Sequence, residues 1–138
     1  MTFFEKAFHR FFDDAEHISA NAVFTGKTMI TPISENLRAK IQFVHTNVVD
    51  NYNALRVIII NRNEGTIDNE IFKFKDIIGM KGNIEPHIWD DEPNIGWYIY
   101  KPTANDYNII SNAIVDYISM YADHNYKNRR NGNESKST

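Results

Sequence analysis

Hydrophobic residues recur every three or four positions in a segment near each end of the chain, which is the spacing of one face of an α-helix. The first such segment is Thr2 to Ala20, where Thr2 and Glu5 also have the spacing of a helix-capping box. The second follows Thr103, which can cap a helix with Asp106 in its first turn. The pattern therefore predicts an N-terminal and a C-terminal helix.

Between these helices the hydrophobic pattern is that of β-strands. Leu37 to His45 alternates apolar and polar residues, which predicts a strand with one face in contact with water. Ala54 to Ile60 is rich in consecutive apolar residues, as is typical of a strand covered on both faces, and we place it centrally in the sheet. A shorter strand is expected within Ala22 to Thr31, broken around Gly26.

Turn-forming residues connect the remaining segments. Asn61 to Gly65 predicts a hairpin that returns through Ile67 to Phe74. Asp76 to Met80 fits a single helical turn, and Pro86 to Asp90 with Gly96 to Lys101 fits a second hairpin. The order of elements predicts an α+β fold, an antiparallel sheet of about five or six strands with the N-terminal and C-terminal helices packed on one face.

The length and composition are those of one domain. A chain of 138 residues with 42% hydrophobic residues can bury a single core. We expect residues 1–124 to form this domain. Residues 125–138 are polar and have no periodicity, so we expect them to form a disordered tail.

The residue types that are missing exclude several classes of site. The chain has no cysteine, so it has no disulfides, thiolate metal sites or cysteine nucleophile. No stretch approaches the roughly 18 consecutive apolar residues of a membrane span, and the N-terminus lacks the pattern of a secretory signal. We therefore expect a cytoplasmic protein that does not bind membranes.

The charge is unevenly distributed. The net charge is −3, yet the polar tail is basic, with Lys127, Arg129, Arg130 and Lys136. The rest of the chain is therefore more acidic than the whole. An acidic domain has no broad field that attracts a phosphate backbone, so we expect no dedicated nucleic-acid binding, although a local basic patch remains compatible with this charge.

Chemically active motifs are weak. His9, Asp13 and His17 share one face of the expected first helix and could bind a divalent metal, but this is also the face on which an amphipathic helix places polar residues. Asp90, Asp91 and Glu92 form an acidic cluster that fits a turn equally well. We assign no catalytic residue and expect no cofactor, and a small metal-dependent hydrolase that uses these residues is the alternative function.

One face of the sheet is the strongest functional candidate. Ile58 and Ile60 point away from Val57 and Ile59, and Arg38 and Lys40 indicate that this face is partly wet. An apolar centre with a polar rim is the usual layout of an interaction surface, which Trp97 and Tyr98 could extend. The competing interpretation is that the segment Ile77 to Ile84, or the first segment of the chain, covers this face.

The leading hypothesis is therefore a small non-enzymatic protein-binding module. Roles of this class include an inhibitor, an immunity protein, a phage or bacterial accessory protein and a chaperone-like adaptor. The partner would be another protein or a second copy of the chain, as in a homodimer. Besides the metal-dependent hydrolase, a small-ligand site between sheet and helices is the remaining alternative.

Overall fold

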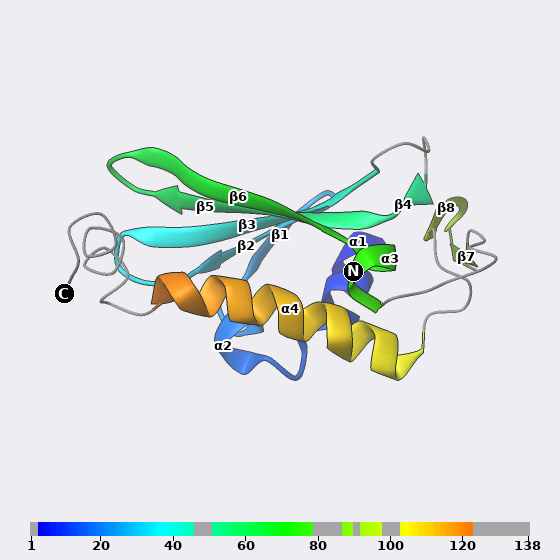
Figure 1. Cartoon of the computed structure of the whole chain (residues 1–138). Helices are drawn as coiled ribbons and strands as arrows, with labels where there is room; N and C mark the ends of the chain where they lie inside the picture. Colours follow the sequence, from blue (N-terminus) through cyan, green and yellow to red (C-terminus); the bar gives the residue numbers. More distant parts are fainter. Residues whose placement is uncertain (1–2, 46–50, 79–86, 90–91, 98–102, 123–138) are drawn as a thin grey trace.

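The computed structural model describes residues 3–45, 51–78, 87–89, 92–97 and 103–122. It is an α+β arrangement in which a five-stranded antiparallel sheet carries helices from both ends of the chain (Figure 1). The elements are α1 (Phe3–Phe12), α2 (Glu16–Ser19), β1 (Val23–Thr25), β2 (Thr28–Pro32), β3 (Leu37–Val44), β4 (Asn51–Tyr52), β5 (Ala54–Asn61), β6 (Gly65–Lys73), α3 (Phe74–Ile78), β7 (His87–Trp89), β8 (Glu92–Trp97) and α4 (Ala104–Ala122).

The five-stranded sheet has the order β1-β2-β3-β5-β6, and every neighbouring pair is antiparallel. The pairing of β3 with β5 is the longest regular one, and it sets Ala39 opposite Ile59 and Lys40 opposite Ile58. The expected interior position of the Ala54 to Ile60 strand is confirmed, since β5 lies between β3 and β6. The middle strand of the sheet is β3.

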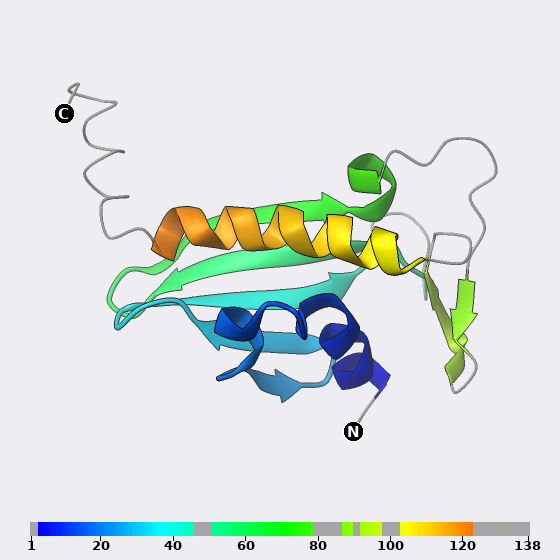
Figure 2. The same ribbon diagram turned by 90° about the horizontal axis from the view of Figure 1, so that it is seen from below.

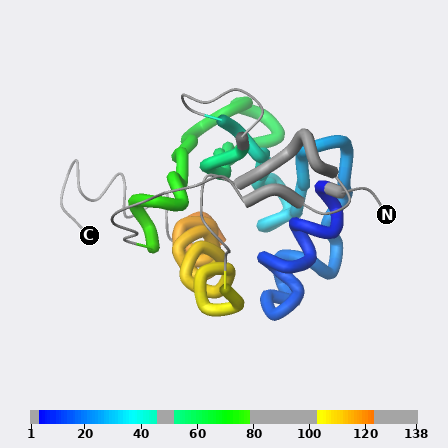
Figure 3. The backbone as a smooth tube through the Cα atoms, turned by 90° about the vertical axis from the view of Figure 1, so that its right-hand side faces the viewer, coloured from blue at the N-terminus to red at the C-terminus, as the bar shows by residue number. Residues whose placement is uncertain are grey.

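The helices lie on one face of this sheet (Figures 2 and 3). Tyr117 of α4 meets Phe72 of β6 edge to face at 5.5 Å. On the same face, toward the other edge of the sheet, α1 and α2 pack on β2. There the buried Thr31 hydroxyl donates a hydrogen bond of 2.6 Å to the carbonyl oxygen of Ile18. The expectation that both terminal helices pack on the same face is therefore confirmed.

The expectation that β5 is covered on both faces is met on one face only. Its side chains alternate in exposure: Leu55, Val57 and Ile59 are fully buried, whereas Ile58 and Ile60 are half-buried. The consecutive isoleucines led to this error. Apolar residues also occur on partly exposed strand faces, so a run of them does not show which face is buried.

The predicted first helix is shorter than Thr2 to Ala20. The backbone N–H of Ala15 donates to the Phe12 carbonyl, three residues back, and Ala15 leaves the helical conformation before α2 starts. In one continuous helix Ile18 would point about 120° away from Phe12. The break lets both side chains enter the core, where Phe12 is 0% and Ile18 is 2% exposed.

The predicted hairpin around Asn61 is confirmed. The Asn61 side-chain oxygen accepts hydrogen bonds from the backbone N–H groups of Asn63 and Glu64, at 2.8 and 3.1 Å. Gly65 follows with a φ of +81°, a conformation that other residues rarely adopt. The Asx turn and the glycine together return the chain antiparallel into β6, which begins at Gly65, two residues earlier than expected.

The second hairpin forms, but outside the five-stranded sheet. Strands β7 and β8 pair antiparallel, and β8 pairs in parallel with the short β4, giving a separate three-stranded sheet. The main sheet ends at β6, and the chain continues from this strand into α3. Trp89 pairs with Glu92, so the connection is shorter than the gap between the expected strands, Pro86 to Asp90 and Gly96 to Lys101.

The cap of the last helix matches the expectation. The Thr103 hydroxyl oxygen accepts a hydrogen bond from the Asp106 N–H at 3.1 Å, and the Asp106 carboxylate accepts one from the Thr103 N–H at 2.8 Å. This reciprocal capping box fixes the start of α4. The expected helical turn over Asp76 to Met80 is found as α3, which begins earlier, at Phe74. Its last two expected residues and the tail from 125 to 138 lie outside the described residues.

Aromatic side chains from four elements form the centre of the core. Phe11 of α1 lies 6.0 Å from Phe43 of β3, 6.0 Å from Phe74 of α3 and 5.1 Å from Tyr107 of α4, measured between ring centroids. Phe8 adds a further contact to Phe43 at 4.9 Å. The helices are thus joined to the sheet and to one another through one cluster of rings.

A second contact joins α4 to the edge of the sheet. The Tyr121 hydroxyl donates a hydrogen bond to the Asp68 carboxylate in β6. The nearby Tyr117 hydroxyl is buried and, within the described part of the chain, has no hydrogen-bond partner. Its burial, and secondarily the charges of Tyr121 and Asp68, raise the pKa of Tyr117 above the ordinary value of 10.0.

The raised pKa of Tyr117 predicts how stability depends on alkaline pH. A phenol that stays neutral in the folded state contributes stability that is complete below pH 10 and declines as the unfolded chain ionises above it. We expect Tyr117→Phe to change the free energy of unfolding by less than about 1 kcal/mol at neutral pH, because it removes an unpaired hydroxyl. Above pH 10 the variant should lose stability less steeply than the native chain in urea titrations.

Tyr121→Phe is the matched control, because it removes a hydroxyl that is hydrogen-bonded. It should destabilise the fold by about 1–3 kcal/mol at neutral pH, since it leaves the Asp68 carboxylate without this donor. Equal losses for the two variants at neutral pH would contradict the description of Tyr117 as unpaired.

Candidate interaction surface

The side of the five-stranded sheet that faces away from the helices forms the candidate site, and we call it the outer face. Its residues follow from strand alternation and register, because paired residues in an antiparallel sheet share a face. At its centre Ile30 pairs with Lys40, which pairs with Ile58, which pairs with Asn69. The neighbouring positions are Thr28, Pro32, Arg38, Gln42, Arg56, Ile60, Thr66, Ile71 and Lys73.

Charge is segregated between the two sides of the sheet. The four basic residues in its strands all lie on the outer face: Arg38, Lys40, Arg56 and Lys73. The two acidic residues are Asp68 and Glu70 of β6, which pair with the inward-facing Ile59 and Val57 and therefore point to the helix side. The outer face is thus basic although the chain as a whole carries −3.

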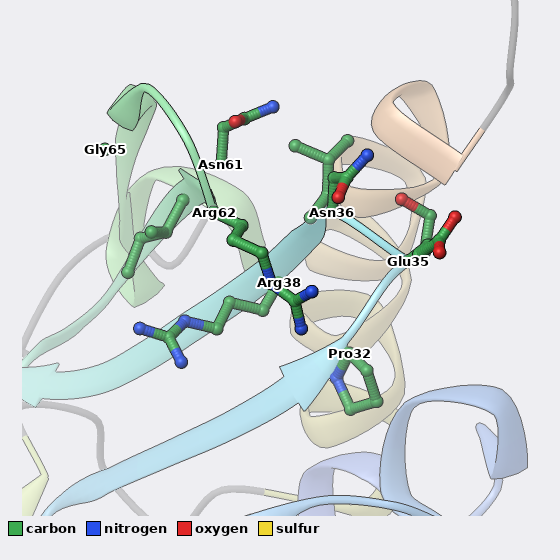
Figure 4. Close-up of a pocket in the computed structure, with 10 residues that line it drawn as sticks. Pro32, Glu35, Asn36, Arg38, Asn61, Arg62 and Gly65 are labelled. Carbon is green, nitrogen blue, oxygen red and sulfur yellow. The ribbon is translucent and has the colours of Figure 1, made fainter.

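A hollow of about 450 Å³ lies at one end of the outer face (Figure 4). We call it the Arg38 hollow. Arg38 contributes from β3 and Arg62 from the turn between β5 and β6, while Glu35 lies on the β2–β3 connection. Ile60 also lines this hollow, so the hollow continues onto the outer face.

A second hollow, of about 510 Å³, lies at the opposite end of the same strands. We call it the Lys73 hollow. Its lining contains no acidic residue and combines Val44 and Ile71 with Lys27, His45, Arg56 and Lys73. The outer face therefore has cationic side chains at both ends and aliphatic side chains between them.

The cations of the outer face are not neutralised within the described part of the chain. Arg38, Lys40 and Lys73 form no ion pair there. The Nε of Arg56 is buried and has no hydrogen-bond partner among the described residues. Lys27 is engaged differently, with its Nζ 5.6 Å from the centre of the Tyr52 ring. The lining of the Lys73 hollow is cationic and contains no acidic residue, so this end of the face is suited to attract an anionic group.

The sequence-predicted surface residues are brought together in part. Arg38 pairs directly with Ile60, and Lys40 pairs directly with Ile58, so these four form two adjacent rows on the outer face. Trp97 belongs to β8 in the three-stranded sheet, which does not extend this surface as a neighbouring strand. Tyr98 lies outside the described residues.

Arg56 and Lys73 were missed by the sequence analysis. The sequence did contain a signal for each of them. Arg56 interrupts an apolar run at an outer-face position, and Lys73 follows Ile71 by two residues, which places both on the same face of a strand. Their side of the sheet became definite only with the register of β5 against β3 and β6.

The residues of the alternative metal site are not assembled. The His9 Nδ1 atom lies 2.8 Å from an Asp13 carboxylate oxygen, and this pair is exposed at the end of α1. His17 is carried by α2, after the break in the helix. Among the residues with described placement, no group of three or more histidine or acidic side chains could hold a metal ion. Asp90 and Asp91 lie outside that set.

Comparison of the chain with protein-family models, with curated proteins and with solved structures finds no match. In the described part of the structure, the helices are all too short or too polar to cross a membrane. Function must therefore be argued from the geometry of the outer face.

The difference between the two faces of β5 is tested by a pair of adjacent substitutions. Ile59→Thr puts a hydroxyl into the fully buried core, so we expect a loss of about 3 kcal/mol or more. Ile58→Thr changes a half-buried outer-face position and should cost about 1 kcal/mol. Urea denaturation measures both, and similar losses would show that the outer face is covered.

Proposed function

We propose that this protein is a non-enzymatic protein-binding module and that its partner docks on the outer face of the five-stranded sheet. The observation that carries the proposal is the pair of cross-strand rows Arg38–Ile60 and Lys40–Ile58, where aliphatic and cationic side chains stand side by side on a regular sheet. Such a mixture of apolar and charged groups is typical of surfaces that bind other proteins.

The layout of the fold supports this proposal. Both terminal helices and the aromatic cluster around Phe11 lie on one side of the sheet, so stability is supplied from that side. The outer face can then vary without loss of the core. Regular strands also hold the backbone of these residues in fixed positions, which lowers the entropy lost on binding.

Half-buried isoleucines are a further support. Ile58 and Ile60 lie at the centre of the outer face and Ile71, which is 40% exposed, lies nearer its edge. A partner that covers them removes apolar surface from water, which is a favourable contribution to binding. The inhibitor, immunity, accessory and adaptor roles all require only a stable surface of this kind.

Site-specific photo-crosslinking in cells of the native organism tests the proposal. A photo-reactive phenylalanine analogue replaces Ile71 on the outer face, and in a second variant it replaces Ile109 on α4. These are matched positions, with exposed fractions of 40% and 36%. We expect a discrete heavier adduct from the Ile71 variant alone.

Two outcomes would contradict this function. One is no adduct at Ile71, and the other is the same adduct at both positions, since either would mean that the outer face is not where a partner binds. Thermal melting of both variants checks that each one is folded.

A further inference from the structure

We propose that the outer face recognises an acidic protein segment in which apolar residues lie between two groups of carboxylates. This inference rests on the proposed function and names the chemistry of the partner. The charge arrangement supports it, because the strands present Arg38, Lys40, Arg56 and Lys73 on this face and no acidic residue. These cations have no carboxylate partner within the described chain, so their pairing capacity is available.

The positions of the cations define the spacing of the carboxylates. Arg38 lies in the row of Ile60, and Arg56 lies four residues back along β5, which is about 13 Å. Lys73 lies in the row of Ala54, which is about 20 Å from the row of Ile60. An α-helix of about 9–13 residues, or a strand of about 4–6 residues, bridges the same span.

The aliphatic centre selects a protein over a nucleic acid. Sheets that bind single strands stack bases on aromatic side chains. The aromatic residues in the five strands are Phe24, Phe43 and Phe72, and all three contact rings of the helices on the inner side. Isoleucines between the cations fit leucine-like side chains of an acidic peptide instead.

A second copy of the chain fits this face poorly. Two outer faces related by a twofold axis would bring basic side chains against one another, which is unfavourable. A contact between the outer face of one copy and the opposite side of another would be head-to-tail and would build a ring or an open filament. A different, acidic partner satisfies the surface in a closed complex.

Binding of defined probes tests the partner chemistry. The first probe is a fluorescent amphipathic peptide with leucines along one helical face and glutamates flanking them at both ends. Its twin carries glutamine in place of glutamate, and a single-stranded oligonucleotide is the third probe. In fluorescence anisotropy the acidic peptide should bind most tightly, and added salt should weaken its binding.

Two lysines provide a matched pair of variants. Lys73 is on the outer face and Lys75 is in α3 two residues later, and both are exposed. Lys73→Glu should raise the Kd of the acidic peptide by about fivefold, because it replaces an attraction with a repulsion. Lys75→Glu should leave the Kd within about twofold, and combining Lys73→Glu with Arg38→Glu should weaken binding further.

The outcomes separate this inference from the proposed function. If the Ile71 adduct forms in cells and disappears when Arg38→Glu and Lys73→Glu are present, both proposals are supported. If the adduct persists unchanged with these reversals, the docking surface stands and the acidic partner is overturned. If no adduct forms with the native charges, the docking surface itself is overturned.

The probes give two further decisive results. Tighter binding of the oligonucleotide than of the acidic peptide would overturn the inference in favour of a nucleic acid. Light scattering that shows a dimer, lost with Arg38→Glu and Lys73→Glu, would overturn it in favour of self-association through the outer face.

Discussion

The register of β3 against β5 determines which side of this protein is core and which is surface. Ala39 lies opposite Ile59 on the buried side, and Lys40 lies opposite Ile58 on the outer side. A shift of β3 by one residue would bring Arg38 and Lys40 under the helices and expose Ile41. The large cost of burying unpaired charge disfavours such a shift.

The helices cover the inner face that the register of the strands defines. Phe8 and Phe11 of α1 pack on Phe43 of β3, and Tyr107 of α4 packs on Phe11, so one aromatic cluster holds both helices against the inner face. The outer face therefore contributes less to the core than the inner face does. Its isoleucines stand beside cations that form no ion pair among the described residues, and we propose this mixture as a surface for a partner.

The sequence predicts the elements better than it predicts their assembly. The alternation from Leu37, the turn at Asn61 and the cap at Thr103 are local signals, and each appears in the structure close to its expected place. The break after Phe12 and the separate sheet of β7 and β8 depend on contacts between distant segments, which one sequence does not encode in a readable pattern. For the same reason Arg38, Lys40, Ile58 and Ile60 could be proposed from sequence, whereas Arg56 and Lys73 required the register.

The most direct test of the account is the accessibility of the isoleucine methyl groups to a paramagnetic agent dissolved in the solvent, measured by NMR on the full chain. We expect strong relaxation enhancement for the outer-face residues Ile58, Ile60 and Ile71, and little for the buried Ile41 and Ile59. Equal protection of Ile58 and Ile59 would show that another part of the chain covers the outer face. That result would contradict the central claim that this face is open to a partner.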